Sequence, residues 1–239
     1  MKLKVMKFGG TSLKSVITRE YVYAHIKKFA QNNKLVIVVS ALGRYPNAFA
    51  TDTLLSYAHE KMSKEEKAWL ASIGEQFAAL RVCAELLEKG YKVKALNYIE
   101  SGIITDHQYE YANIIELDDG PLKGYLEHYD IVVVGGFLGV NPSYKVTTLG
   151  RGGSDYSAVL FAHMLGLKEV DIYSDVDGVY DMDPNLNNNA HKYHSLSYDE
   201  MLNLKSRVLD DRCVDYAKKY KIQIHLLGTF SENEGTYIQ

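Results

Sequence analysis

The sequence predicts an α/β fold in which a mostly parallel β-sheet carries helices on both faces. The main observation is that short runs of β-branched residues alternate with longer stretches of helical spacing along the chain. In addition, the runs at 35–39 and 131–134 are continuously apolar, which is typical of strands buried on both faces of a sheet. Ligands of such sheets bind beyond the carboxyl ends of the strands. We therefore expect the functional residues in the loops that follow the strands.

In the first half of the chain, strands are expected at 3–7, 35–39 and 93–96. A helix is expected over 15–31, because its apolar residues recur at helical spacing. The stretch 53–89 has the same spacing but predicts two helices. Its break lies before Ser63, which forms a capping-box pattern with Glu66 and so begins a new helix.

In the second half, strands are expected at 131–134, 170–173 and 222–226. Helices are expected at 120–128, 154–166, 197–205 and 206–220. Gly166 marks the end of the second of these, since glycine commonly terminates helices. The alternation of strands and helices continues to the end of the chain and supports a parallel sheet.

The composition limits the classes of partner. The chain has 27 Lys and Arg against 30 Asp and Glu, a net charge of -3, whereas nucleic-acid and anionic-membrane binders carry a basic excess. Its apolar runs fall far short of the roughly 20 residues that span a bilayer, and we expect no signal peptide because no apolar run follows the N-terminal lysines. The two cysteines, Cys83 and Cys213, lie within helical patterns and suggest a reduced compartment. We therefore expect no nucleic-acid partner, no membrane partner and a cytoplasmic location.

The first candidate motif, KFGGTS at 7–12, follows the first strand. Gly9 and Gly10 allow the backbone to approach phosphate oxygens closely, and Lys7 adds a positive charge. The chain contains no Walker A pattern. Taken alone, the six residues fit a tight turn beside a surface lysine equally well.

The second candidate motif is TTLGRGGSD at 147–155, in which three glycines precede a helix. Arg151 within this turn can grip a carboxylate or a phosphate with two hydrogen bonds. Asp155 fits a site in which it holds a lysine or a phosphate-bound Mg²⁺. An ordinary helix cap explains Ser154 and Asp155 but not Arg151, so we favour a binding site here.

The third segment, at 173–184, follows a strand and holds four acidic residues. It lacks the pattern of an EF-hand, so an acidic turn is the favoured interpretation from these residues alone. His191 and His194 have no third ligand nearby in the sequence, and we expect no zinc or other metal held by protein ligands.

Together these segments resemble the amino-acid kinase family, and most closely its aspartokinases. The resemblance covers the whole chain in order. Its motifs are KFGGTS at 7–12, VVSALG at 38–43, ATDTLL at 50–55, SIGE at 72–75, GFLG at 136–139, TTLGRGGSD at 147–155 and DVDGVYDMDP at 175–184.

The resemblance implies a fold and a reaction. The fold is a three-layer α/β/α sandwich with a central, mainly parallel sheet. A single domain spans 1–239, with the amino acid bound in its N-terminal part and ATP in its C-terminal part. The reaction uses ATP and Mg²⁺ to phosphorylate the side-chain carboxylate of L-aspartate to 4-phospho-L-aspartate, the first step toward lysine, threonine and methionine. The family also suggests a homodimer.

The implied residue roles fall on the motifs. Lys7 would neutralise the transferring phosphoryl group, and Asp155 would orient Lys7 or the hydrated Mg²⁺. Glu75 would take the substrate ammonium and Arg151 the α-carboxylate. The other implied ATP-binding residues are Gly9, Gly10, Ser12, Ser174, Asp175, Tyr180, Asn185 and Arg207, and the other implied substrate-binding residues are Thr53, Gly153 and Ser154.

Three departures from the family pattern leave other functions open. Asn185 stands where the family has arginine, Arg207 replaces lysine, and Asp210-Asp211 replaces His-Pro. The alternatives are a related kinase acting on another acidic amino acid or analogue, and a weakly active aspartate-binding subunit of a larger kinase assembly. Aspartokinases usually continue past a segment like 234–238 into ACT modules. We therefore expect no ACT regulatory domain here and no response to lysine or threonine.

Overall fold

A computed structural model describes residues 2–182, 186–187, 189–204 and 208–239. Its main sheet has eight strands in the order β10-β12-β11-β9-β1-β2-β6-β3, and every neighbouring pair is parallel except β11 with β12. The strands are β1 (Lys2–Phe8), β2 (Asn33–Val39), β3 (Val93–Leu96), β6 (Ile131–Gly135), β9 (Glu169–Ser174), β10 (Ser195–Leu196), β11 (Gln223–Gly228) and β12 (Thr236–Ile238). The predicted mainly parallel sheet is confirmed.

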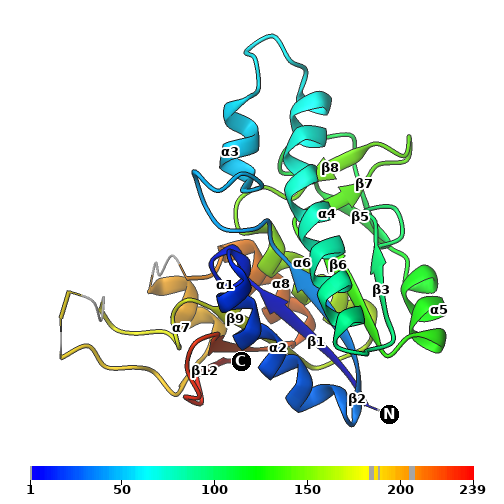
Figure 1. The fold of residues 1–239 in the computed structure, drawn as a ribbon. Helices are drawn as coiled ribbons and strands as arrows, with labels where there is room; N and C mark the ends of the chain where they lie inside the picture. Colours follow the sequence, from blue (N-terminus) through cyan, green and yellow to red (C-terminus); the bar gives the residue numbers. More distant parts are fainter. Residues whose placement is uncertain (1, 183–185, 188, 205–207) are drawn as a thin grey trace.

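Helices cover both faces of this sheet (Figure 1). One face carries α1 (Gly10–Leu13), α2 (Val16–Ala30) and α4 (Lys64–Glu88), and the other carries α5 (Gly120–His128), α6 (Gly153–Met164), α7 (Tyr198–Asn203) and α8 (Asp211–Tyr220). Strand β2 shows why: its side chains alternate, with Ile37 in the core beneath α2 and α4 and Val36 and Val38 in the core beneath α6. The three-layer α/β/α sandwich is thus confirmed.

A second sheet of four short strands stands beside the main one, in the order β5-β4-β7-β8. Its strands are β4 (Ile103–Thr105), β5 (Ile114–Leu117), β7 (Leu138–Val140) and β8 (Val146–Thr148). The sequence did not predict it: strands of three or four residues carry little periodic signal, and among the described strands of this length only β3 was expected.

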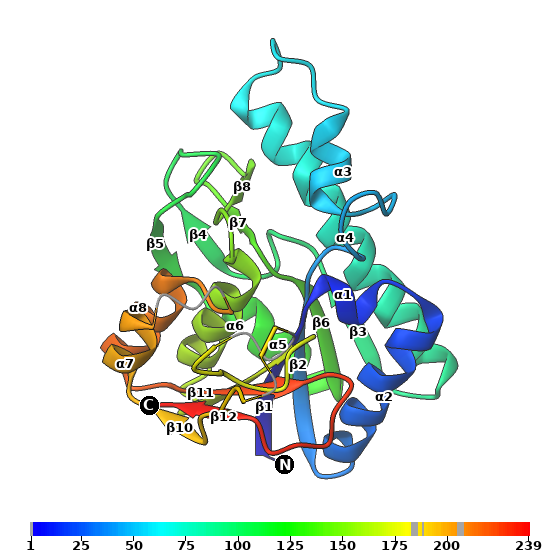
Figure 2. The same cartoon turned by 90° about the vertical axis from the view of Figure 1, so that its left-hand side faces the viewer.

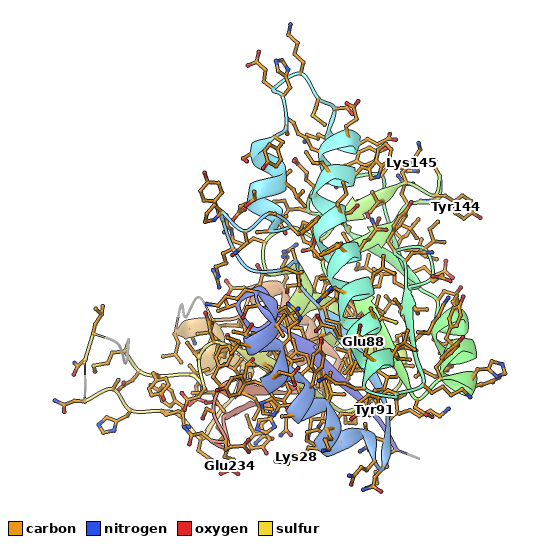
Figure 3. The ribbon with its side chains drawn as sticks, viewed as in Figure 1. Lys28, Glu88, Tyr91, Tyr144, Lys145 and Glu234 are labelled. Carbon is orange, nitrogen blue, oxygen red and sulfur yellow. The ribbon has the colours of Figure 1, made fainter. Side chains whose placement is uncertain are left out.

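This small sheet and the N-terminal half of α4, with α3 (Thr51–Ser56) packed on it, rise above the main sheet where β1 leads into α1 (Figure 2). Tyr144 and Lys145 lie at the outer end of the small sheet, while Glu88 and Tyr91 lie at the opposite end of α4 (Figure 3). An ion pair of 3.0 Å between Lys145 Nζ and Glu65 Oε1 joins the two raised parts. The space between them is therefore framed by elements from distant parts of the sequence.

Local signals account for most helix boundaries. Ser63 and Glu66 form the predicted capping box at the start of α4, and α5 has the predicted bounds. The helix expected from residue 206 instead begins at Asp211. Its start is fixed by Asp210, whose carboxylate accepts a hydrogen bond from the Arg212 amide. Residues 205–207 lie outside the described part of the chain.

The two cysteines lie on opposite faces of the sheet. Cys83 belongs to the core beneath α2 and α4, Cys213 belongs to the core beneath α6, and both are free thiols. No helix among the described residues has the length and apolar character needed to cross a bilayer.

Candidate active site

A cavity of about 520 Å³ lies at the carboxyl ends of the parallel strands, as predicted. Segments that follow β1, β2, β6, β8 and β9 contribute to its walls, together with α3 and α4. Of the predicted site residues, those that line it are Lys7, Gly9, Gly10, Ser12, Glu75, Arg151, Gly153, Ser154, Asp155, Ser174 and Asp175. The fold thus brings the first two motifs and the start of the third together.

Lys7 and Asp155 form the charged centre of the cavity. Lys7 Nζ lies 2.6 Å from Asp155 Oδ1, and the two side chains are only 9% and 13% exposed. Lys7 lies in the buried part of β1, one residue before its end, while Asp155 lies in the first turn of α6. Because α6 crosses the sheet directly behind β1, two residues 148 positions apart meet as a partly buried ion pair. The predicted pairing of these two residues is present in the structure.

Glu75 supplies a second acidic group from α4. Its side chain is buried, with Oε1 accepting hydrogen bonds from Thr51 Oγ1 at 3.2 Å and from the Ala41 amide at 3.4 Å. Burial raises the pKa of this carboxyl to about 8, and the hydrogen bonds oppose the shift only in part. Among the described residues, its Oε2 has no hydrogen-bond partner. Such a group is suited to receiving a cation from a ligand.

The turn between β8 and α6 presents Arg151 to the cavity, and the first two residues of α6, Gly153 and Ser154, line it as well. Arg151 is exposed, so its guanidinium is open to a ligand. Ser154 packs against the end of β6: a Cβ at Gly136 would lie 2.9 Å from Ser154 Cα. This close approach fixes the start of α6 against the main sheet.

Hydrogen bonds to distant residues fix the segment after β1. The Gly9 amide donates to the Tyr173 carbonyl at 3.3 Å, and the Ser12 hydroxyl is buried against Thr229. Both groups therefore hold the loop in place, and since both residues line the cavity, ATP binding by Gly9 and Ser12 stays a prediction. Gly10 remains tightly packed, since a Cβ there would lie 2.6 Å from the Gly43 carbonyl oxygen.

Two predicted residues that the structure describes, Thr53 and Tyr180, are not among those lining the cavity. Thr53 is buried one position along from Asp52, which does line it, and its Oγ1 has no hydrogen-bond partner among the described residues. Tyr180 lies in the loop after β9 and donates to Asp177 Oδ1 at 2.7 Å, a bond that raises the pKa of the tyrosine to about 12. Asn185 and Arg207 lie outside the described residues.

Several lining residues were missed. Ser40 and Arg44 follow β2, and their position directly after a buried strand was a usable signal. Arg44 Nε reaches Thr11 Oγ1 at 3.4 Å. Glu110 and Tyr111 come from the loop between β4 and β5, and nothing in their local sequence places them at the cavity.

The residues present fit a nucleotide-borne Mg²⁺. This ion keeps several waters and needs only one or two protein carboxylates beside the phosphates. Asp155 and Asp175 offer carboxylates at the cavity wall. Outside the cavity, Glu169, Asp171 and His225 also cluster. Lys4 Nζ already lies 2.9 Å from the Asp171 carboxylate, so an ammonium group occupies the place of a cation there.

Comparisons with known proteins show what this chain is similar to. The model of the amino acid kinase family matches residues 2–228. Aspartokinase 1 of Bacillus subtilis (strain 168) is 36% identical over 245 residues, which cover 100% of this chain and 61% of that protein. The chain thus spans less than two thirds of this curated relative.

Solved structures show the same fold. Aspartate kinase from Synechocystis matches with a TM-score of 0.85 and 33% identity, over 99% of this chain and 39% of that one. E. coli aspartokinase III, in complex with aspartate and ADP, matches with a TM-score of 0.82 over 100% of this chain and 64% of that one. At 23% identity, the second likeness concerns the fold alone.

Proposed function

This chain belongs to the amino acid kinase family, and from that premise we propose that it transfers the γ-phosphoryl group of ATP to the side-chain carboxylate of L-aspartate. The products are 4-phospho-L-aspartate and ADP. The observation that carries the proposal is the Lys7–Asp155 ion pair of 2.6 Å, which lies in one cavity with Glu75 and Arg151. The similarity to aspartokinases over the whole chain supports the choice of substrate.

The chemistry requires charge neutralisation rather than a general base. A side-chain carboxylate is ionised at neutral pH, since the reference pKa of Asp is about 3.9. One carboxylate oxygen forms a bond to the γ-phosphorus, and the bond from that phosphorus to the β–γ bridging oxygen breaks. No proton is transferred. The obstacle is repulsion between two anions, and Lys7 supplies the positive charge that offsets it.

Asp155 holds the Lys7 ammonium in place. The ion pair limits the freedom of the flexible lysine stem, so the charge is fixed before the substrates bind. Mg²⁺ carried by the nucleotide would add further positive charge on the phosphates. Asp155 and Asp175 are the residues that would face it or its waters.

Two groups of opposite charge would recognise the amino-acid backbone. Glu75 would accept the ammonium group, and Arg151 would bind the α-carboxylate with two hydrogen bonds. A bound ammonium favours the ionised form of Glu75, because an opposite charge stabilises a carboxylate against burial.

The nucleotide would lie beyond β9, where Ser174 and Asp175 line the cavity. Tyr180 would act on the nucleotide site indirectly, because its hydroxyl donates to Asp177 in the same loop. We still expect the amino acid to bind mainly in the N-terminal part of the domain and ATP in the C-terminal part, although Lys7 and Arg151 each serve the other part. A cytoplasmic homodimer is part of the same proposal, and light scattering of the purified protein tests the assembly.

Purified protein with Mg-ATP and L-aspartate should form an acyl phosphate that hydroxylamine traps as a hydroxamate. The Lys7→Ala variant should lose this product. Lys14→Ala, which removes an exposed lysine just after α1, is the matched control and should retain it. A panel with L-glutamate and other acidic amino acids distinguishes the related-kinase alternative. If the wild type forms no more hydroxamate than Lys7→Ala with any of these amino acids, the result contradicts the proposal.

A further inference from the structure

Arg212, in the first turn of α8, contacts the turn that carries Arg151. Its Nη2 donates to the Arg151 carbonyl oxygen at 2.8 Å, and its Nε donates to Asp210 Oδ1 at 2.9 Å. The guanidinium carbon also lies 5.2 Å from the ring centre of Tyr111 and 5.8 Å from that of Tyr156. One side chain therefore joins the Arg151 turn, α8, α6 and the loop from the small sheet.

The turn needs such support because its backbone is unusual. Gly150 and Gly152 have φ values of +76° and +69°, in the left-handed region that favours glycine. Glycines lose more conformational freedom on ordering than other residues, so a turn built on them is held by its surroundings. Tyr111 packs against Gly150 on one side and Asp210 against Gly152 on the other, and neither glycine has room for a Cβ.

We propose that Arg212 is a positioning residue for the amino-acid substrate: it fixes the Arg151 turn through the Arg151 carbonyl and thereby aims the Arg151 guanidinium at the substrate carboxylate. This inference rests on the proposed function. Arg212 itself is not among the residues that line the cavity, so it acts through Arg151.

The inference also gives Asp210 a role at the position where the family has histidine. Its Oδ1 accepts hydrogen bonds from both the amide and the Nε of Arg212, so it caps α8 and orients the guanidinium at once. This departure from the family pattern thus supports the amino-acid half of the site.

The test compares Arg212→Lys and Arg212→Met with the wild type. A lysine keeps the charge but lacks the fork that reaches both oxygens, and methionine lacks both. We expect the KM for L-aspartate to rise about tenfold in Arg212→Met and by a smaller factor in Arg212→Lys, with the KM for ATP changed less than about twofold. Lys219→Met, an exposed cation on the same helix, is the control and should leave both values unchanged.

A purely structural role for Arg212 would lower the stability of the protein or raise both KM values together. Either result, without a selective rise in the KM for L-aspartate, overturns the inference. Hydrogen exchange tests the positioning independently of activity. Amides at 150–156 should exchange about tenfold faster in Arg212→Met than in the Lys219→Met control, because the turn opens locally. If the wild type phosphorylates no amino acid but these amides still exchange faster in Arg212→Met than in the control, the result contradicts the proposed function while supporting the contact. If the wild type is active but the amides at 150–156 exchange at the same rate in Arg212→Met and in the control, only the inference about Arg212 is contradicted.

Discussion

Ser12 Oγ and Thr229 Oγ1 lie 2.6 Å apart in the protein interior, although 217 positions separate the two residues. Ser12 belongs to α1, directly after β1, and Thr229 directly follows β11. The Thr229 amide donates to the Ser174 carbonyl at 2.8 Å, and its own carbonyl lies 3.0 Å from His25 Nε2. Thr229 therefore ties the glycine segment after β1 to the strand ends where the nucleotide is proposed to bind.

Thr229→Val keeps the shape of the side chain but removes its hydroxyl. The Ser12 hydroxyl then loses this buried partner, which costs about 1–3 kcal/mol. We expect lower stability in urea unfolding and a KM for ATP raised severalfold, while the KM for aspartate changes little. Thr229→Ser, which retains the hydroxyl, should restore both quantities. A valine variant with wild-type stability and KM would show that the bond does not hold the segment.

Asp155→Asn tests the role of the Lys7–Asp155 ion pair in charge neutralisation. The change keeps the size of the side chain but removes the charge that fixes Lys7. We expect kcat to fall by about 10²–10³, as when one preorganised electrostatic group is lost from an active site. Asp215→Asn, an exposed acid on α8, is the control for charge loss as such. Comparable kcat values for the two variants would exclude a catalytic role for Asp155.

Glu75 predicts a pH dependence of substrate binding. Burial raises its pKa to about 8, so the carboxylate that pairs with the substrate ammonium becomes more populated as pH rises toward that value. The apparent KM for L-aspartate should therefore fall between pH of about 6 and about 8. In Glu75→Gln this dependence should vanish and binding should be weak throughout. A pH-independent KM in the wild type argues against this role.

The same group predicts how the stability of the free protein depends on pH. Between the ordinary value of 4.5 and about 8, the folded protein retains a proton on Glu75 that the unfolded chain has released. The free energy of unfolding should therefore decrease as pH rises across this range. Urea unfolding of the wild type and Glu75→Gln at several pH values measures this, and the glutamine variant should show the smaller decrease.

A buried ion pair between α2 and α4 supplies a stability prediction. Arg19 Nε and Nη2 bind the two Glu85 oxygens at 2.8 Å and 2.6 Å, joining α2 to α4. Burial alone would raise the pKa of Glu85, but hydrogen bonds from Arg19 and Tyr23 outweigh it and lower the pKa to about 2. The ionised Glu85 therefore adds to the free energy of unfolding above pH of about 4.5, and this stabilisation is lost as pH falls toward about 2.

Glu85→Gln leaves the Arg19 guanidinium buried without its counter-charge, which costs about 3–5 kcal/mol at neutral pH. Glu88→Gln, exposed at the end of the same helix, should change stability by less than about 0.5 kcal/mol. Urea unfolding at neutral pH compares the two, and equal midpoints would show that the pair contributes no net stability.

Local signals in the sequence were enough for the parallel core and for the larger helices. The continuous apolar runs of β2 and β6 required burial on both faces, and the Ser63–Glu66 capping box fixed the start of α4. The small sheet escaped prediction because its strands of three or four residues are stabilised by their neighbours rather than by a pattern of their own. Glu110 and Tyr111 were missed with it.

The sequence by itself determined which chemical groups this protein carries at the ends of its strands, because local patterns place a glycine turn or a charged residue directly after a buried run. Tertiary structure decided which of those groups are held by internal hydrogen bonds and which are open to the cavity. The Ser12 hydroxyl turns to Thr229 and the Gly9 amide to Tyr173, while Arg151 remains open to the cavity. Hydrogen bonds between residues this far apart in sequence exist only once the strands are assembled, and a buried polar group takes whichever partner the packing provides.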